Sequence, residues 1–264
     1  MQNILKDKVA VVYGAGSIGG TVAQTFAREG ARVFVANRSE EAAEKVAAAI
    51  RRTGGQVETA KVDALDWQSI ESFVQGVVTK TGRLDISFNV VQVSKGGEQG
   101  TPLVKLKYED FALPITVYTK TQFLTANAAT PQMVKQGSGV IMMITAFPSR
   151  LPLAGTVGFG PAWAAIEALS RTLAAELGPH GIRTVCLHST GTPESAKSIE
   201  TTWSADPEIA KIFKEDLSKR VPIISLIPKL NSLQEVGEMA AFMASDLAGS
   251  TTGTIANMSS GIVV

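Results

Sequence analysis

Three glycines near the N-terminus are spaced as G-x-G-x-x-G within the stretch YGAGSIGG. A short apolar run precedes this stretch and a helical pattern follows it, which is the context that the spacing requires. Glycines permit a tight turn and a close approach of the backbone, and the start of the helix offers free N–H groups to a pyrophosphate. We predict a phosphate site at these turn residues: Gly14, Gly16, Ser17, Ile18 and Gly19.

The next apolar run ends at Asn37, and Arg38 and Ser39 follow it. A site that prefers NAD usually has an acidic side chain here, which binds the ribose hydroxyls. Arg38 instead offers paired N–H donors that suit the 2′-phosphate of NADP, and Ser39 adds a hydroxyl. We therefore predict that NADP(H) is preferred over NAD(H). The alternative is a solvated arginine at the start of a helix.

Short apolar runs alternate with helical patterns from end to end, which predicts the elements that position these residues. Nearly continuous apolar strands indicate a parallel sheet that helices cover on both faces. We predict an α/β fold, a Rossmann-type doubly wound parallel sheet, in a single domain over 1–264. The less regular segment at about 190–230 is typical of a substrate lid.

Composition excludes several classes of function. The 264 residues carry a net charge of +1, which provides no basic surface for nucleic acid or anionic membranes. The single cysteine, Cys186, cannot form an internal disulfide, and no Cys/His spacing indicates a metal site. The N-terminal residues lack a signal-peptide pattern, and the longest apolar run is too short to span a membrane. We expect a cytoplasmic protein.

Four stretches show a resemblance to a known family: YGAGSIGG, QGSGVIMMITA, AAELGPHGIRTV and EVGEMAAFMASDLAGSTTGTIANMSSG. Over nearly its whole length the chain resembles short-chain dehydrogenases/reductases, in particular reductases of the β-ketoacyl-carrier-protein type. Their T-G-x-x-x-G-x-G turn has Tyr13 in place of Thr here, and Ile18–Gly19 replaces the usual Gly–Ile order.

The resemblance implies further cofactor contacts. Asp63 matches the family's aspartate that meets the adenine, with Ala64 beside it. The stretch FNVVQ occupies the place of N-N-A-G and keeps only the asparagine. The residues implied there are Asn89, Val90 and Val91.

The same resemblance shows that the family's reactive residues are replaced. Phe159 stands at the position of the catalytic Tyr, Trp163 at that of its Lys, and Ala146 at that of the carbonyl-polarising Ser. The family's Tyr hydroxyl exchanges the proton that accompanies hydride transfer, and the Lys lowers its pKa. Phenylalanine has no such proton, and an indole does not titrate usefully. The usual proton path is therefore missing.

Two residues could replace it. Tyr118 stands where the family has an Asn, and His188 ends the sixth predicted strand beside the nicotinamide region. A phenol could donate a proton, and an imidazole suits acid–base work near neutral pH. A hydrogen-bonded Tyr and a His satisfied at a strand end are the structural alternatives. Phe159 and Trp163 either wall an apolar pocket or pack their helix against its neighbours.

We therefore predict an NADP(H)-binding oxidoreductase of this family with an atypical site. Two other functions stay open: a catalytically silent NADP-binding sensor or assembly protein, and a non-redox lyase or isomerase on the same fold. The expected partner is a small, apolar organic substrate, with no nucleic acid, membrane or metal. The resemblance implies a homodimer or homotetramer.

Overall fold

The computed structural model describes residues 3–92, 99–192, 194 and 225–262. Most of the predicted lid at about 190–230 lies outside these residues. Within them, one parallel sheet has seven strands in the order β3-β2-β1-β4-β5-β6-β7. The strands are β1 Val9–Tyr13, β2 Arg32–Asn37, β3 Val57–Lys61, β4 Ile86–Asn89, β5 Gly139–Ala146, β6 Ile182–Ser189 and β7 Thr254–Met258.

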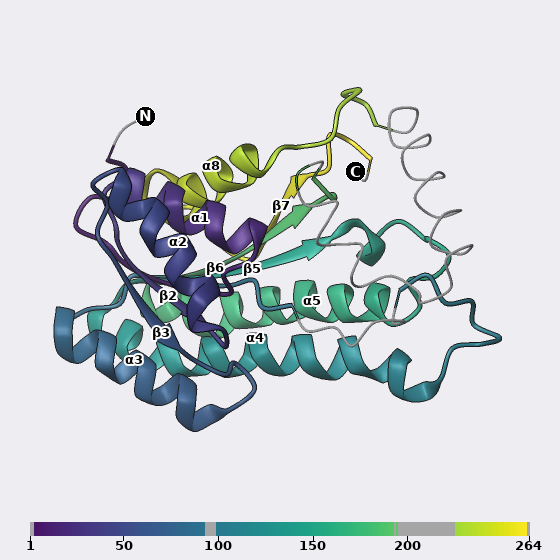
Figure 1. Ribbon diagram of the computed structural model, residues 1–264, viewed down its shortest axis with the longest axis horizontal. Coiled ribbons are helices and arrows are strands. Elements are labelled where there is room, and N and C mark those ends of the chain that lie inside the picture. The colour runs from purple at the N-terminus through teal and green to yellow at the C-terminus, as the bar shows by residue number, and fades with distance from the viewer. Residues whose placement is uncertain (1–2, 93–98, 193, 195–224, 263–264) are drawn as a thin grey trace.

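Helices cover both faces of this sheet (Figure 1). The α-helices are α1 Ser17–Arg28, α2 Glu40–Arg52, α3 Trp67–Thr81, α4 Tyr108–Gln136, α5 Phe159–Leu177 and α8 Leu233–Ala244. Three short 3-10 helices are η1 Phe147–Ser149, η2 Gly178–His180 and η4 Asp246–Ala248. The doubly wound parallel α/β sheet predicted from the sequence is confirmed.

Alternation along the strands divides the core into two layers. In β1, Val12 packs with α1, α2 and α8, whereas Val11 packs with α3, α4 and α5. Successive strand residues point to opposite faces, so a strand covered on both sides needs apolar residues throughout. The strand order reverses between β1 and β4, and in such sheets ligands bind beyond the carboxyl ends of the strands near this point.

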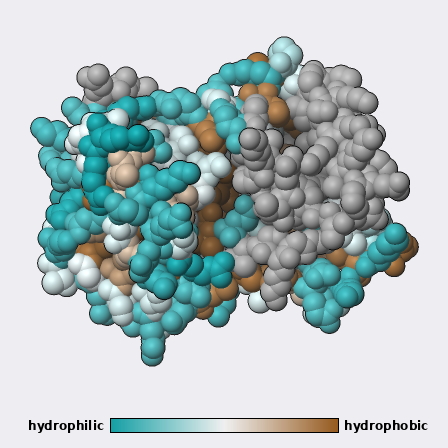
Figure 2. Space-filling view, in the orientation of Figure 1, coloured by the Kyte–Doolittle hydropathy of each residue, from teal (hydrophilic) through white to brown (hydrophobic). Residues whose placement is uncertain are grey.

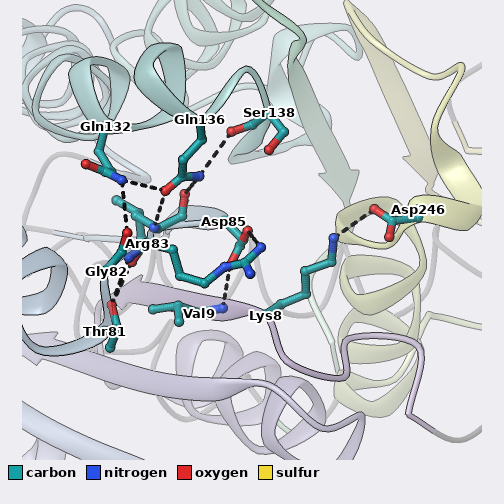
Figure 3. Close-up of polar contacts among 11 residues, drawn as sticks. Lys8, Val9, Thr81, Gly82, Arg83, Asp85, Gln132, Gln136, Ser138 and Asp246 are labelled. Atoms are coloured by element: carbon teal, nitrogen blue, oxygen red, sulfur yellow. Dashed lines mark hydrogen bonds and ion pairs between the residues drawn. The ribbon is translucent and has the colours of Figure 1, made fainter.

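A hydrogen-bonded group at the opposite, amino end of the sheet joins β1 to β4 (Figure 3). The buried carboxylate of Asp85 accepts the Val9 N–H at 2.8 Å and two N–H groups of Arg83 at 2.8 and 2.7 Å. The Gln136 side chain, at the end of α4, both accepts the Leu84 N–H at 2.8 Å and donates to its carbonyl at 2.9 Å. These contacts fix the register of β1 against β4. The candidate site is built at the opposite, carboxyl ends of the same strands.

We predict that Asp85→Ala lowers the free energy of unfolding by about 1–3 kcal/mol, because it leaves the buried Val9 N–H without a partner. Asp246→Ala is the control, since this aspartate is 86% exposed and, among the described residues, its side chain forms one ion pair, with Lys8 on the surface. The free energy of unfolding of Asp246→Ala should fall by no more than about 1 kcal/mol. Urea unfolding of both variants checks the difference, and equal losses would contradict the role of Asp85.

Candidate nucleotide site and altered catalytic positions

The turn between β1 and α1 requires glycine at two places. Gly14 has φ +107°, and its N–H donates to the carbonyl of Ala36 at 2.8 Å. A Cβ on Gly19 would lie 2.0 Å from the carbonyl oxygen of Gly14. Any side chain there would collide with backbone, so the turn folds back on the first turn of α1 only because both residues are glycine.

The loop after β4 closes on this turn. The Val90 N–H donates to the Tyr13 carbonyl at 3.0 Å, and Val90 Cγ1 lies 2.9 Å from the Cβ position built on Gly19. The buried Asn89 side chain shapes the loop, because its Oδ1 accepts the Val91 N–H at 2.8 Å. Its Nδ2 donates to Thr125 Oγ1 of α4 at 2.9 Å. The asparagine therefore positions the loop through its own side chain.

Beyond the turn, the start of α1 has room for an anion. Gly16 is the N-cap of α1 and provides no side-chain hydrogen bond to the helix. A Cβ built on Gly16 would have no atom within 4 Å. The first N–H groups of a helix lack intrahelical partners and attract negative charge. A pyrophosphate fits the glycine turn together with the open space at Gly16 and the free N–H groups at the start of α1.

The end of β2 places Arg38 beside this turn. Asn37 Oδ1 accepts the Ala15 N–H at 3.3 Å, and its Nδ2 donates to the Ser39 carbonyl at 3.1 Å. Ser39 Oγ caps α2 by accepting the Ala42 N–H at 3.2 Å. Arg38 itself is exposed, and within the described part of the chain its guanidinium has no hydrogen bond or ion pair. An exposed guanidinium therefore follows the strand end that is hydrogen-bonded to this turn.

Asp63 follows β3 and is exposed. Its Oδ1 accepts the Leu65 N–H at 2.9 Å, and its own N–H donates to Ser69 Oγ at 3.1 Å. The neighbouring Ala64 is buried. The loop geometry therefore holds one carboxylate oxygen of Asp63 and leaves the other for a ligand.

Tyr118, Phe159 and Trp163, which the resemblance aligns with the family's Asn, Tyr and Lys, form an aromatic cluster. The Tyr118 and Trp163 rings stack at 4.8 Å with an interplanar angle of 7°. Phe159 lies 5.8 Å from Tyr118 and 6.1 Å from Trp163, measured between ring centroids. Tyr118 and Phe159 are each 1% exposed. These contacts favour the packing interpretation of Phe159 and Trp163 over a free pocket wall.

His188 lies in a buried polar group, here called the carboxylate cluster, made of Thr145, Ser149, Arg150, Glu167 and His188. Glu167 Oε1 accepts from Ser149 Oγ at 2.7 Å and from Thr145 Oγ1 at 3.2 Å, and it lies 3.0 Å from His188 Nδ1. Arg150 Nε donates to the other carboxylate oxygen at 3.2 Å. Three segments of the chain thus meet on one side chain of α5.

The pKa of Glu167 reflects this setting. Burial by itself raises the pKa, but hydrogen bonds from His188 and Ser149 and the charge of Arg150 outweigh burial and lower it to about 2. The carboxylate is therefore ionised near neutral pH. The adjoining thiol of Cys186 is buried, and burial raises its pKa to about 12, which agrees with a structural cysteine.

Sequence reasoning identified His188 but missed Glu167, Ser149 and Arg150. The available signal was a glutamate within the otherwise apolar run AAIEALS. A charged residue on a buried helix face needs a partner, and the partners came from β6 and η1.

In the described residues no group of three or more His, Cys, Asp or Glu side chains could hold a metal. None of the helices described is both long and apolar enough to cross a membrane.

Known proteins similar to this chain agree with the fold. The family described as Enoyl-(Acyl carrier protein) reductase matches residues 14–263. The oxidoreductase UcpA of Salmonella typhimurium is 30% identical over 254 residues, covering 95% of this chain and 92% of the relative. The uncharacterised oxidoreductase YxbG of Bacillus subtilis is 28% identical over 260 residues, covering 98% and 92% of the two chains.

A solved structure is also similar. It is a 7α-hydroxysteroid dehydrogenase in complex with NADH and 7-oxo glycochenodeoxycholic acid, with a TM-score of 0.83 and 26% identity. The match covers 98% of this chain and 96% of that one. The chain therefore belongs to the short-chain dehydrogenase/reductase family.

The glycine turn leads to a matched pair of variants. Gly19→Ala should lower the free energy of unfolding by about 1–3 kcal/mol or more, because its methyl group meets the Gly14 carbonyl. Gly16→Ala should cost less than about 1 kcal/mol, since its φ is −74° and the space is open. Chemical denaturation compares them, and equal stability would contradict the close approach.

The lowered pKa of Glu167 predicts a pH dependence of stability. A carboxylate with a lower pKa in the folded state stabilises the fold above its ordinary pKa of 4.5, and this stabilisation is lost as pH falls toward about 2. The stability difference between wild type and Glu167→Gln should therefore shrink between about pH 5 and about pH 3. Glu176→Gln, on an exposed face of α5, should show no such change. Urea midpoints across this range measure it.

Proposed function

We propose that the protein is an NADP(H)-dependent oxidoreductase that does not use the family's Ser, Tyr and Lys. The observation that carries the proposal is the unpaired guanidinium of Arg38 beside a glycine turn with open space at the start of α1. Guanidinium N–H groups bind phosphate through paired hydrogen bonds, and this group has no internal competitor in the described residues.

The residues present fit the cofactor, and each has a separate task. The turn and the first N–H groups of α1 bind the pyrophosphate, and Arg38 and Ser39 bind the 2′-phosphate. Asp63 accepts a hydrogen bond from the adenine, while Asn89 holds Val90 and Val91 against the turn. When bound, the nicotinamide supplies hydride transfer.

Proton exchange has to come from elsewhere in the chain. Ala146, Phe159 and Trp163 carry no titratable group. Tyr118 and His188 are the two candidates for the proton-exchanging group. Figure 2 shows apolar side chains in the middle of the molecular face, and we propose an apolar organic substrate.

The solved relative holds a cyclic steroid ketone, 7-oxo glycochenodeoxycholic acid, and this also favours a small organic alcohol or ketone. We propose in addition that the chain assembles into a homodimer or homotetramer. The exposed Phe123 and Val134 of α4 support such an assembly, since exposed apolar side chains on a helix suit contact with a second copy.

A second candidate is an NADP(H)-binding sensor or assembly protein without turnover. The aromatic cluster favours it, because the packed rings of Phe159 and Trp163 lie where the resemblance places the family's acid and its lysine. A lyase or isomerase would need no hydride, so it would leave Arg38 and the glycine turn without a chemical task.

Titration with NADPH and NADH tests the proposal. NADPH should bind wild type much more tightly than NADH, and Arg38→Ala should weaken NADPH binding by about 10- to 100-fold because hydrogen bonds to the charged 2′-phosphate are lost. NADH binding should change little. Arg52→Ala, an exposed arginine at the end of α2, is the control and should bind as wild type. Failure to bind either nucleotide, or equal loss in both variants, would overturn the proposal.

A further inference from the structure

One nitrogen of His188 is buried without a partner among the residues that the structure describes. The side chain is 0% exposed, and within those residues Nε2 has no hydrogen bond. The other nitrogen, Nδ1, lies 3.0 Å from Glu167 Oε1, with Thr145 Oγ1 at 3.4 Å and Ser149 Oγ at 3.5 Å. Leaving a buried polar atom unpaired costs free energy, so each such atom calls for an explanation.

The contact with Glu167 decides which nitrogen carries the proton. The Glu167 carboxylate is ionised near neutral pH, so it only accepts hydrogen bonds. Nδ1 must therefore be the donor, and in the neutral ring Nε2 is left with a free lone pair. A histidine whose Nε2 can accept a proton while a carboxylate holds its Nδ1–H has the arrangement of a general base.

The surroundings keep Glu167 charged and in place. Arg150 pairs with Oε2, and Ser149 and Thr145 donate to Oε1. Cys186, the other titratable group beside Thr145, stays protonated because burial raises its pKa to about 12. The buried charge thus has one cation and three hydrogen-bonding partners, and His188 is the partner that can exchange a proton.

The pair lies beside the position where the family polarises its substrate. His188 faces Thr145 across the β5–β6 ladder, and the next residue pair is Ala146 and Ser189. Ser149 follows Ala146 by three residues and donates to both the Ala146 carbonyl and Glu167. The strand ends that would hold a reacting carbon in this family therefore also hold this histidine.

We propose, resting on the proposed function, that His188 is the catalytic base of alcohol oxidation and that Glu167 is its positioning residue. The substrate O–H bond breaks and its proton goes to His188 Nε2. The substrate C–H bond breaks and its hydrogen leaves with both electrons for the nicotinamide of NADP⁺, which is reduced. The carbon–oxygen double bond forms, so the products are a ketone, NADPH and a proton on His188.

The tautomer of His188 tests the positioning role without any substrate. The chain has only two histidines, so nitrogen NMR of ¹⁵N-labelled protein resolves both, and His180→Gln assigns them. We expect His188 to carry its proton on Nδ1 and to have an unprotonated Nε2 near neutral pH. In Glu167→Gln this preference should weaken. An Nε2–H tautomer in wild type would overturn the assignment.

Oxidation of cyclohexanol and of glycochenodeoxycholate by NADP⁺, followed through NADPH formation, tests the base. His188→Gln should lower kcat by at least about 100-fold while NADPH still binds. Glu167→Gln should lower kcat with little change in KM. Glu176→Gln and His180→Gln, both at exposed positions, should match wild type.

Three outcomes separate the two proposals. If neither nucleotide binds, the proposed function fails. If NADPH binds but wild type oxidises neither alcohol, or if His188→Gln retains its rate, the assignment of His188 as base fails and the cofactor site stands. If Tyr118→Phe abolishes turnover and His188→Gln does not, the proton path runs through the phenol instead.

Discussion

The buried charge of Glu167 is the constraint that organises the carboxyl ends of β5 and β6 against α5. An isolated carboxylate in a core would cost several kcal/mol, so it must be paired and hydrogen-bonded. The partners come from the end of β5, from η1 with the residue after it, and from β6. Because all these partners contact Glu167 of α5, they set how the strand ends and this helix lie against one another.

The glycine turn between β1 and α1 depends on a different constraint, which is close backbone contact. Gly19 sits against the carbonyl of Gly14, and Val90 packs on both. These contacts lie at β1 and β4, where the strand order reverses, whereas the carboxylate cluster lies at β5 and β6. The glycine turn and the carboxylate cluster are therefore built from separate contacts.

Relatives of 28–30% identity cover nearly the whole chain, and a solved relative superimposes with a TM-score of 0.83. Such agreement reflects the apolar alternation and the turns that the fold needs, and these requirements do not include the reactive residues. Trp163 stacks with Tyr118, and the Phe159 ring packs against Tyr118 at a tilt of 58°. The packing of α5 against α4 is thus kept by aromatic contact.

Local pattern alone determined the parallel sheet, the glycine turn and the place of Arg38, because strand alternation and turn chemistry act over a few neighbouring residues. The partnership of Glu167 with His188 was decided only by tertiary structure. The two residues are 21 positions apart on different elements, and each has an ordinary structural interpretation by itself. A single sequence carries no signal for a contact that arises when a helix packs across a sheet, and the charge of Glu167 needed that packing to find its partners.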